Sequence, residues 1–131
     1  MSAHLDPHGL PPGYPFRRDD ETTPRELRAL ASSGAPGSCT VLDVRTQPEA
    51  DICRLEGSML LPLQVLEARI DDLKAAVDDK LDTRIVVYCH HGRRSLTATF
   101  MLRAAGFTNV TSLAGGIDLW ARDIDPAMAT Y

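Results

Sequence analysis

The chain has 131 residues, of which 44% are hydrophobic and 24% charged, and its formal net charge at pH 7 is −4. This length and balance are typical of one globular domain that buries a core without disulfides, and we expect a single domain over residues 21–131. The negative charge argues against nucleic-acid binding. The chain shows no signal peptide and no apolar run long enough to span a membrane, so we expect a cytoplasmic protein.

The chain has three cysteines, Cys39, Cys53 and Cys89. An odd number without regular spacing argues against a disulfide framework and suits a reducing compartment. We expect Cys39 and Cys53 to be packing residues rather than resolving thiols.

The first half of the chain predicts two short helices and two strands. Residues 1–20, rich in proline, glycine and charge, predict an extended N-terminal arm. A capping box from Thr23 to Glu26, with proline at the first helical position, predicts a helix to about residue 33. Residues 40–44 predict a buried strand, and a second capping box from Thr46 to Glu49 predicts a brief helix. Residues 58–63 predict another strand.

In the second half of the chain, predicted helices and strands continue to alternate. Residues 64–77 predict an amphipathic helix with Val65, Ile70, Leu73 and Val77 near one face. Residues 84–88 predict the central strand, residues 95–105 a helix that Gly106 ends, and residues 110–113 the last strand before a short helix containing Trp120. This order predicts an α/β fold with a mainly parallel sheet of about five strands, helices on both faces, and a site beyond the carboxyl ends of the strands.

The segment from Val86 to Ser95, VVYCHHGRRS, is the most informative about function. A strand ends at Cys89, and a tight loop leads from it to a helix N-terminus. Unpaired N–H groups and the helix dipole bind anions at such a position, and the anion here would be a thiolate or a group bonded to it. Thiols in such surroundings are nucleophiles, so we expect reactive rather than inert chemistry at Cys89.

The length of this loop separates two chemistries. Cysteine-dependent phosphatases place an arginine six residues after the cysteine, whereas this chain has Ser95 there and Arg94 one residue earlier. A shorter loop forms a tighter cup, which suits a terminal sulfur better than a phosphate.

The pattern Cys-x-x-Gly-x-Arg-Ser from Cys89 to Ser95 resembles the active-site loop of the rhodanese family of single-domain sulfurtransferases. Segments 42–49, 52–58 and 105–120 are similar to other signatures of that family. The ends, 10–15 and 124–131, resemble the C-terminal rhodanese domain of enzymes that activate small sulfur-carrier proteins. The resemblance implies the three-layer rhodanese-like fold.

The loop and the resemblance together imply a role for each residue. We expect Cys89 to take a sulfane sulfur from an anionic donor, such as thiosulfate or a persulfide, and to pass it as a persulfide to a thiophilic acceptor. Gly92 would let the backbone close around the sulfur. Arg94 would anchor the loop or contact the donor, and Arg93 would recognise an anion such as thiosulfate.

Further residues have expected supporting roles. We expect Ser95 to cap the helix and to donate to the sulfur. His90 and His91 would line the mouth of the loop. Since adjacent histidines do not easily reach one ion, we expect no metal, and the reaction needs no cofactor. Asp43 and Arg45 would form a structural charge pair beneath the site.

The charges suggest the kind of partner. Four arginines and no acid lie between Thr83 and Ile117. This basic stretch predicts a positive cleft that attracts a small anionic sulfur donor. The expected acceptor is a small sulfur-carrier protein or a thiol of the thioredoxin or glutathione type. The alternatives are a non-catalytic binding module of the rhodanese fold, against which the intact loop argues, and a phosphatase or arsenate reductase of related fold.

Overall fold

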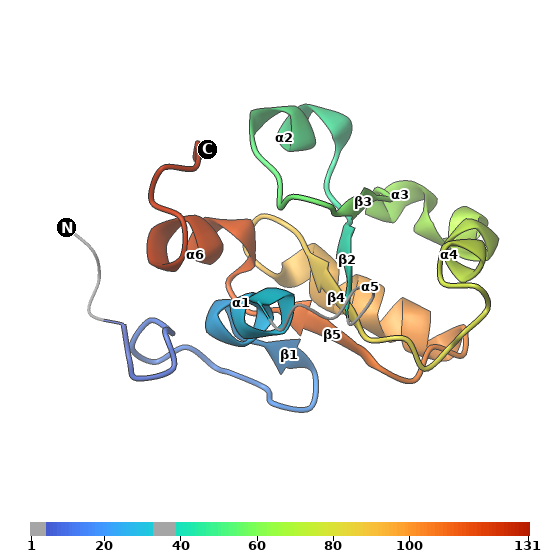
Figure 1. Cartoon of the computed structure of the whole chain (residues 1–131), viewed down its shortest axis with the longest axis horizontal. Helices are drawn as coiled ribbons and strands as arrows, with labels where there is room; N and C mark the ends of the chain where they lie inside the picture. The colour runs from blue at the N-terminus through green and yellow to red at the C-terminus, as the bar shows by residue number, and fades with distance from the viewer. Residues whose placement is uncertain (1–4, 33–38) are drawn as a thin grey trace.

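The computed structural model describes residues 5–32 and 39–131, and its strands form one five-stranded sheet (Figure 1). The strand order is β1-β5-β4-β2-β3, and every neighbouring pair is parallel. The strands are β1 (Glu21–Thr22), β2 (Thr40–Asp43), β3 (Met59–Leu60), β4 (Ile85–Tyr88) and β5 (Val110–Leu113). The predicted α/β class and parallel sheet are confirmed.

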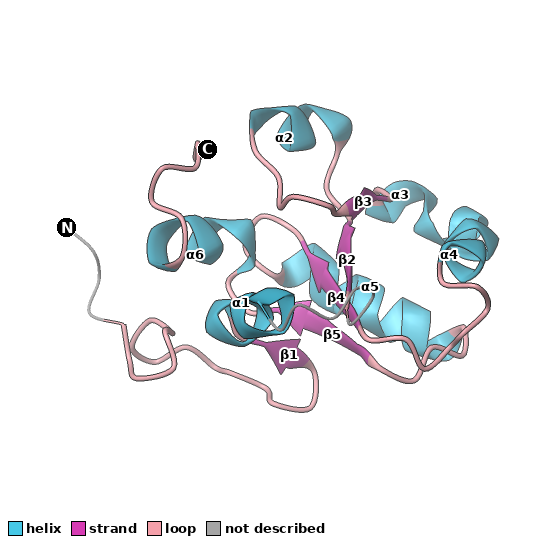
Figure 2. Ribbon diagram, in the orientation of Figure 1, coloured by secondary structure: helices cyan, strands magenta, loops and turns pink. Residues whose placement is uncertain are grey.

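Helices cover both faces of the sheet, which confirms the predicted three layers (Figure 2). Helices α1 and α6 pack on one face, and α3, α4 and α5 pack on the other. The helical segments are α1 (Pro24–Ser32), α2 (Gln47–Ile52), α3 (Leu63–Leu66), the 3₁₀ turn η1 (Glu67–Arg69), α4 (Ile70–Ala76), α5 (Arg93–Ala104) and α6 (Gly116–Asp123). No helix in these described ranges is long and apolar enough to cross a membrane.

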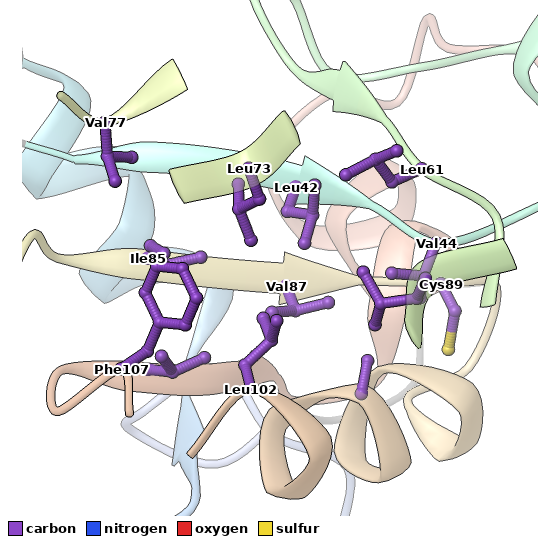
Figure 3. Close-up of a cluster of buried hydrophobic side chains, with 13 residues drawn as sticks. Leu42, Val44, Leu61, Leu73, Val77, Ile85, Val87, Cys89, Leu102 and Phe107 are labelled. Atoms are coloured by element: carbon purple, nitrogen blue, oxygen red, sulfur yellow. The ribbon is translucent and has the colours of Figure 1, made fainter. Parts of the chain in front are cut away.

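The central strand β4 is buried on both faces, so it reads as a continuous apolar run. Ile85 and Val87 pack with α4 and α5, whereas Val86 and Tyr88 pack with α1 and α6. This alternation has a period of two, so the next residue, Cys89, falls on the α5 side. Figure 3 shows Cys89 at one end of that hydrophobic cluster.

The predicted helix over residues 64–77 is interrupted. The 3₁₀ turn η1 separates α3 from α4, and a 3₁₀ turn has three residues per turn rather than 3.6. Across the interruption, Leu66, Ile70, Leu73 and Val77 still face the sheet at helical spacing. Val65 lies beside that face and is 39% exposed, contrary to the prediction, whereas its neighbour Leu66 is buried.

The predicted strand over residues 58–63 was too long. Regular pairing covers only Met59 and Leu60, because the chain reaches Pro62, which has no N–H for a ladder and precedes the first residue of α3. Strand β1 has no signal in the sequence. Its two residues, Glu21 and Thr22, are polar, and only pairing with β5 makes them a strand.

The N-terminal segment lies against the domain rather than extending away from it over its described part. Leu10 is buried with Ala114 and Leu119 near α6. The Tyr14 hydroxyl donates to Glu21 at 2.7 Å and accepts the Gly115 N–H at 3.0 Å. The segment therefore ties β1 to the start of α6.

Candidate active site

The Cys89 sulfur lies beyond the carboxyl end of β4 and is surrounded by donors from the loop that follows. The residue is only 1% exposed. Backbone N–H groups of Gly92 and Ser95 donate to Sγ at 3.1 and 3.3 Å, and the Ser95 hydroxyl lies 3.4 Å from it. Two N–H donors and one hydroxyl thus converge on one sulfur, an arrangement that stabilises negative charge there.

Gly92 closes the loop and precedes the first residue of α5. Its φ of 110° lies in the left-handed region that favours glycine. Because α5 begins at Arg93, the helix cap is Gly92, and the prediction of Ser95 as the cap is wrong. Ser95 instead sits in the first turn, where its own N–H is free to reach the sulfur.

The start of α6 holds the other side of the loop. The N–H groups of Ile117 and Asp118 donate to the carbonyls of Cys89 and His90 at 2.9 and 3.1 Å. A Cβ on Gly116 would lie 2.3 Å from the His90 carbonyl oxygen, so only glycine permits this close approach. The loop is therefore fixed by two helix N-termini.

Arg94 anchors the loop to α2. Its guanidinium makes two parallel hydrogen bonds to the Glu49 carboxylate, at 2.7 and 2.9 Å. These bonds favour the predicted anchoring role over contact with the sulfur donor. Glu49 also accepts the Thr46 N–H at 3.2 Å, as the predicted capping box requires. The bonds from Arg94 hold the pKa of Glu49 far below its usual range. The sequence predicts Glu49 as a capping residue but does not predict its ion pair with Arg94.

Asp43 and Arg45 form the predicted charge pair beneath the site. Their side chains are 1% and 0% exposed, with Nη2 and Oδ2 2.9 Å apart. The Tyr88 hydroxyl donates to the same carboxylate at 3.0 Å, and Arg45 also donates to the carbonyls of Glu49 and Cys53. The pair therefore joins β2, β4 and α2 below the loop.

Comparison with known proteins identifies the fold family. The rhodanese-like domain family matches residues 23–123. The chain belongs to the rhodanese-like family. It is 34% identical over 110 residues to the maize (Zea mays) adenylyltransferase and sulfurtransferase MOCS3-1, covering 83% of this chain and 23% of that protein. A probable adenylyltransferase/sulfurtransferase, MoeZ of Mycobacterium tuberculosis, is 35% identical over 109 residues, 83% of this chain and 26% of its own.

The structural comparison agrees. The human single-domain sulfurtransferase TSTD1 superposes with a TM-score of 0.66 at 29% identity, over 76% of this chain and 93% of its own. By contrast, this rhodanese-like chain spans only about a quarter of the length of the two curated relatives.

Two histidines and the C-terminal segment line the rim of the rhodanese-like loop. The His90 ring stacks on Tyr131 at 3.9 Å, and the Tyr131 hydroxyl donates to Glu49 at 2.7 Å and accepts from Arg45 at 3.1 Å. Burial, together with the neighbouring His91, lowers the pKa of His90. Through Tyr131 the rim is therefore hydrogen-bonded to both ion pairs, Arg94–Glu49 and Arg45–Asp43.

One group of side chains on this rim has the spacing of metal ligands. Candidate ligand atoms of His90, His91 and Asp118 all lie within 4.8 Å of one another, so the two adjacent histidines come closer together than we expected from the sequence. The Asp118 carboxylate already pairs with Arg122 at 3.1 Å, and that positive charge opposes a cation. The rhodanese-like loop itself uses none of these atoms to hold its sulfur.

The predicted positive cleft is weaker than the sequence suggests. Arg94 pairs with Glu49, and Arg103 pairs with Asp20, so distant parts of the chain supply the acids that the local stretch lacks. Arg93 is exposed at the first position of α5, and the described chain places no acidic group within ion-pair distance of it. It is the residue of this stretch best placed to meet an anion.

Sequence reasoning missed two residues that border the loop of this rhodanese-like domain. Tyr14 contacts Gly115 at the start of α6, and Ser112 on β5 lies 2.7 Å from the Ser95 hydroxyl. Both lie outside the loop in sequence, and although the segments that contain them resemble family signatures, nothing in those segments indicates a contact with the loop.

Proposed function

We propose that this rhodanese-like chain is a sulfurtransferase that carries a sulfane sulfur on Cys89. The Cys89 thiolate attacks the outer sulfur of the donor, so a new S–S bond forms while the donor's S–S bond breaks and its remainder leaves as an anion. An acceptor nucleophile then attacks the outer sulfur of the persulfide, and the Cys89 thiolate is regenerated. These two half-reactions need no external oxidant and predict ping-pong kinetics.

The observation that carries this proposal is the convergence of two backbone N–H groups and the Ser95 hydroxyl on the Cys89 sulfur. They stabilise the thiolate both before attack and as the leaving group in the second step. A phosphatase instead needs its arginine turned toward the bound phosphate. The paired bonds from Arg94 to Glu49 argue against that use.

We propose a small anionic donor, thiosulfate or a low-molecular-weight persulfide. Cys89 is only 1% exposed, which favours a slender donor that can reach the bottom of the cup. Arg93 would bind the donor's negative end. An Arg93→Ala variant is expected to raise KM for thiosulfate with little change in kcat, and an unchanged KM would exclude this role.

We propose a small sulfur-carrier protein as the acceptor, with thiols of the thioredoxin or glutathione type as the alternative. The names of the maize and mycobacterial relatives pair adenylyltransferase with sulfurtransferase activity, and these relatives support this choice. A reducing, cytoplasmic compartment fits three free cysteines.

The test is steady-state turnover of thiosulfate and cyanide to thiocyanate and sulfite. We expect parallel double-reciprocal plots, no turnover by Cys89→Ser, and no hydrolysis of p-nitrophenyl phosphate. Hydrolysis of the phosphate ester would instead support the phosphatase alternative. A folded protein that uses neither thiosulfate nor a persulfide donor would support the binding module.

A further inference from the structure

Two buried hydroxyl groups stand in line behind the Cys89 sulfur. The Ser95 Oγ lies 3.4 Å from Cys89 Sγ, and the Ser112 Oγ lies 2.7 Å from the Ser95 Oγ. Ser95 and Ser112 are both 0% exposed. Ser95 belongs to α5 and Ser112 to β5, so the contact joins two elements at the floor of the loop.

The number of hydrogens decides the direction of these bonds. Each hydroxyl has one hydrogen to donate, and within the described chain the Ser112 Oγ has no side-chain or backbone partner other than Ser95. If Ser95 donated to Ser112, the sulfur would lose its hydroxyl donor and the Ser112 hydrogen would be left buried without an acceptor. If Ser112 donates to Ser95, both hydrogens are used.

We propose that Ser112 is a positioning residue for the sulfur chemistry, which it serves by donating to Ser95 so that the Ser95 hydroxyl points at Cys89. Bonds in such a chain polarise one another, and the effect is larger in a buried site of low dielectric. Ser112 therefore strengthens the hydrogen bond that Ser95 gives to the thiolate or to the persulfide. The inference rests on the proposed function in that Cys89 reacts as a thiolate.

Other groups act on the same sulfur and remain in every variant. Arg94 of α5 and Tyr14 of the N-terminal segment both interact electrostatically with the thiol, and His90 follows it in the loop. Ser112 differs from these because it is uncharged and reaches the sulfur only through Ser95. Because of this difference, a double-mutant cycle of Ser95 and Ser112 can separate the effect of Ser112 from the effects of the other groups.

The experiment measures the rate of Cys89 alkylation by iodoacetamide against pH, with thiolate absorbance near 240 nm as a second readout. Cys39 and Cys53 are replaced by serine in every protein compared. We expect Ser95→Ala to raise the midpoint of the profile by roughly 1 to 2 units, the value of a hydrogen bond to a charged group. We expect Ser112→Ala to raise it by about 0.1 to 0.6 unit, as a polarisation of 10–30% implies.

The decisive comparison is Ser112→Ala in a Ser95→Ala background, where the substitution should have no further effect on the midpoint. Thr111→Val is the matched control, because it removes a hydroxyl from the same strand at a pair with Thr22, and it should leave the profile unchanged. A shift from Ser112→Ala that persists without Ser95, or no shift in its presence, would overturn the inference.

Alkylation needs no sulfur donor. A Ser112-dependent profile in a protein that transfers no sulfur would therefore support this inference while refuting the proposed function.

Discussion

The reactivity of Cys89 depends on a few individual atoms that contact its sulfur. The sulfur receives the N–H groups of Gly92 and Ser95, and both are available because they lie at the start of α5, where N–H groups have no partner within the helix. The conformation of Gly92 is what turns its N–H inward. The geometry of the cup therefore depends on one left-handed residue.

This dependence predicts the effect of Gly92→Ala. The nearest heavy atom to an added Cβ is 3.5 Å away, so there is room for it, but the φ of 110° is unfavourable for alanine. We expect a loss of about 1–2 kcal/mol in the free energy of unfolding and a slower alkylation of Cys89. Gly57→Ala is the control, since Gly57 has a φ of 78° and open space around it. Equal alkylation rates in the two variants would contradict the account.

Residues of the site could be predicted from the sequence where their partners are close along the chain. The loop from Cys89 to Ser95, and the pair Asp43 and Arg45, were recognised because each is a local pattern. Glu49 and Ser112 were not assigned to the site, because their partners lie 45 and 17 residues away. Sequence periodicity carries no signal for such contacts.

Among the helices and strands, α2 is stabilised and linked to α5 by one residue, Glu49. This carboxylate caps its own helix through Thr46 and holds α5 through Arg94. Both side chains are partly exposed, at 19% and 32%, so solvent screens their interaction. We expect Glu49→Gln to lower the free energy of unfolding by about 1 kcal/mol at neutral pH.

The pH dependence of this effect has a definite sign. Because Arg94 depresses the pKa of Glu49, the stabilisation is fully present above the ordinary carboxyl pKa of about 4.3. It is lost as the pH falls toward the lower folded-state pKa. Urea midpoints of the wild type and Glu49→Gln should therefore converge on acidification, and exposed Glu56→Gln should match the wild type throughout. A gap that stays constant into acid would contradict this explanation.

Element types were predictable and several boundaries were not. The capping boxes at Thr23 and Thr46 are present, because each depends on residues three apart. The start of α5, the interruption at η1 and the short strand β1 depend instead on contacts with the loop, the sheet and β5. Those contacts are tertiary, and local propensity does not report them.

At the scale of the whole molecule, the buried pair Asp43 and Arg45 connects the sheet to segments outside it. It links β2 and β4 to α2 and, through Tyr131, to the C-terminal segment. We expect Asp43→Asn to cost about 3–5 kcal/mol, since it leaves a buried guanidinium without its countercharge. Domain stabilities are only about 5–15 kcal/mol, so the urea midpoint should fall steeply.

Asp82→Asn, at an exposed position, is the control for that loss and should leave the urea midpoint unchanged. A loss below about 1 kcal/mol in Asp43→Asn would mean that Arg45 finds other partners and that the pair does not hold the layers together.

Intact mass after incubation with thiosulfate shows whether Cys89 carries sulfur as a persulfide. We expect a gain of one sulfur atom that cyanide removes and that Cys89→Ser does not show. A gain that persists in Cys89→Ser would place the chemistry elsewhere. No gain with either thiosulfate or a small persulfide donor would contradict sulfur transfer by this protein.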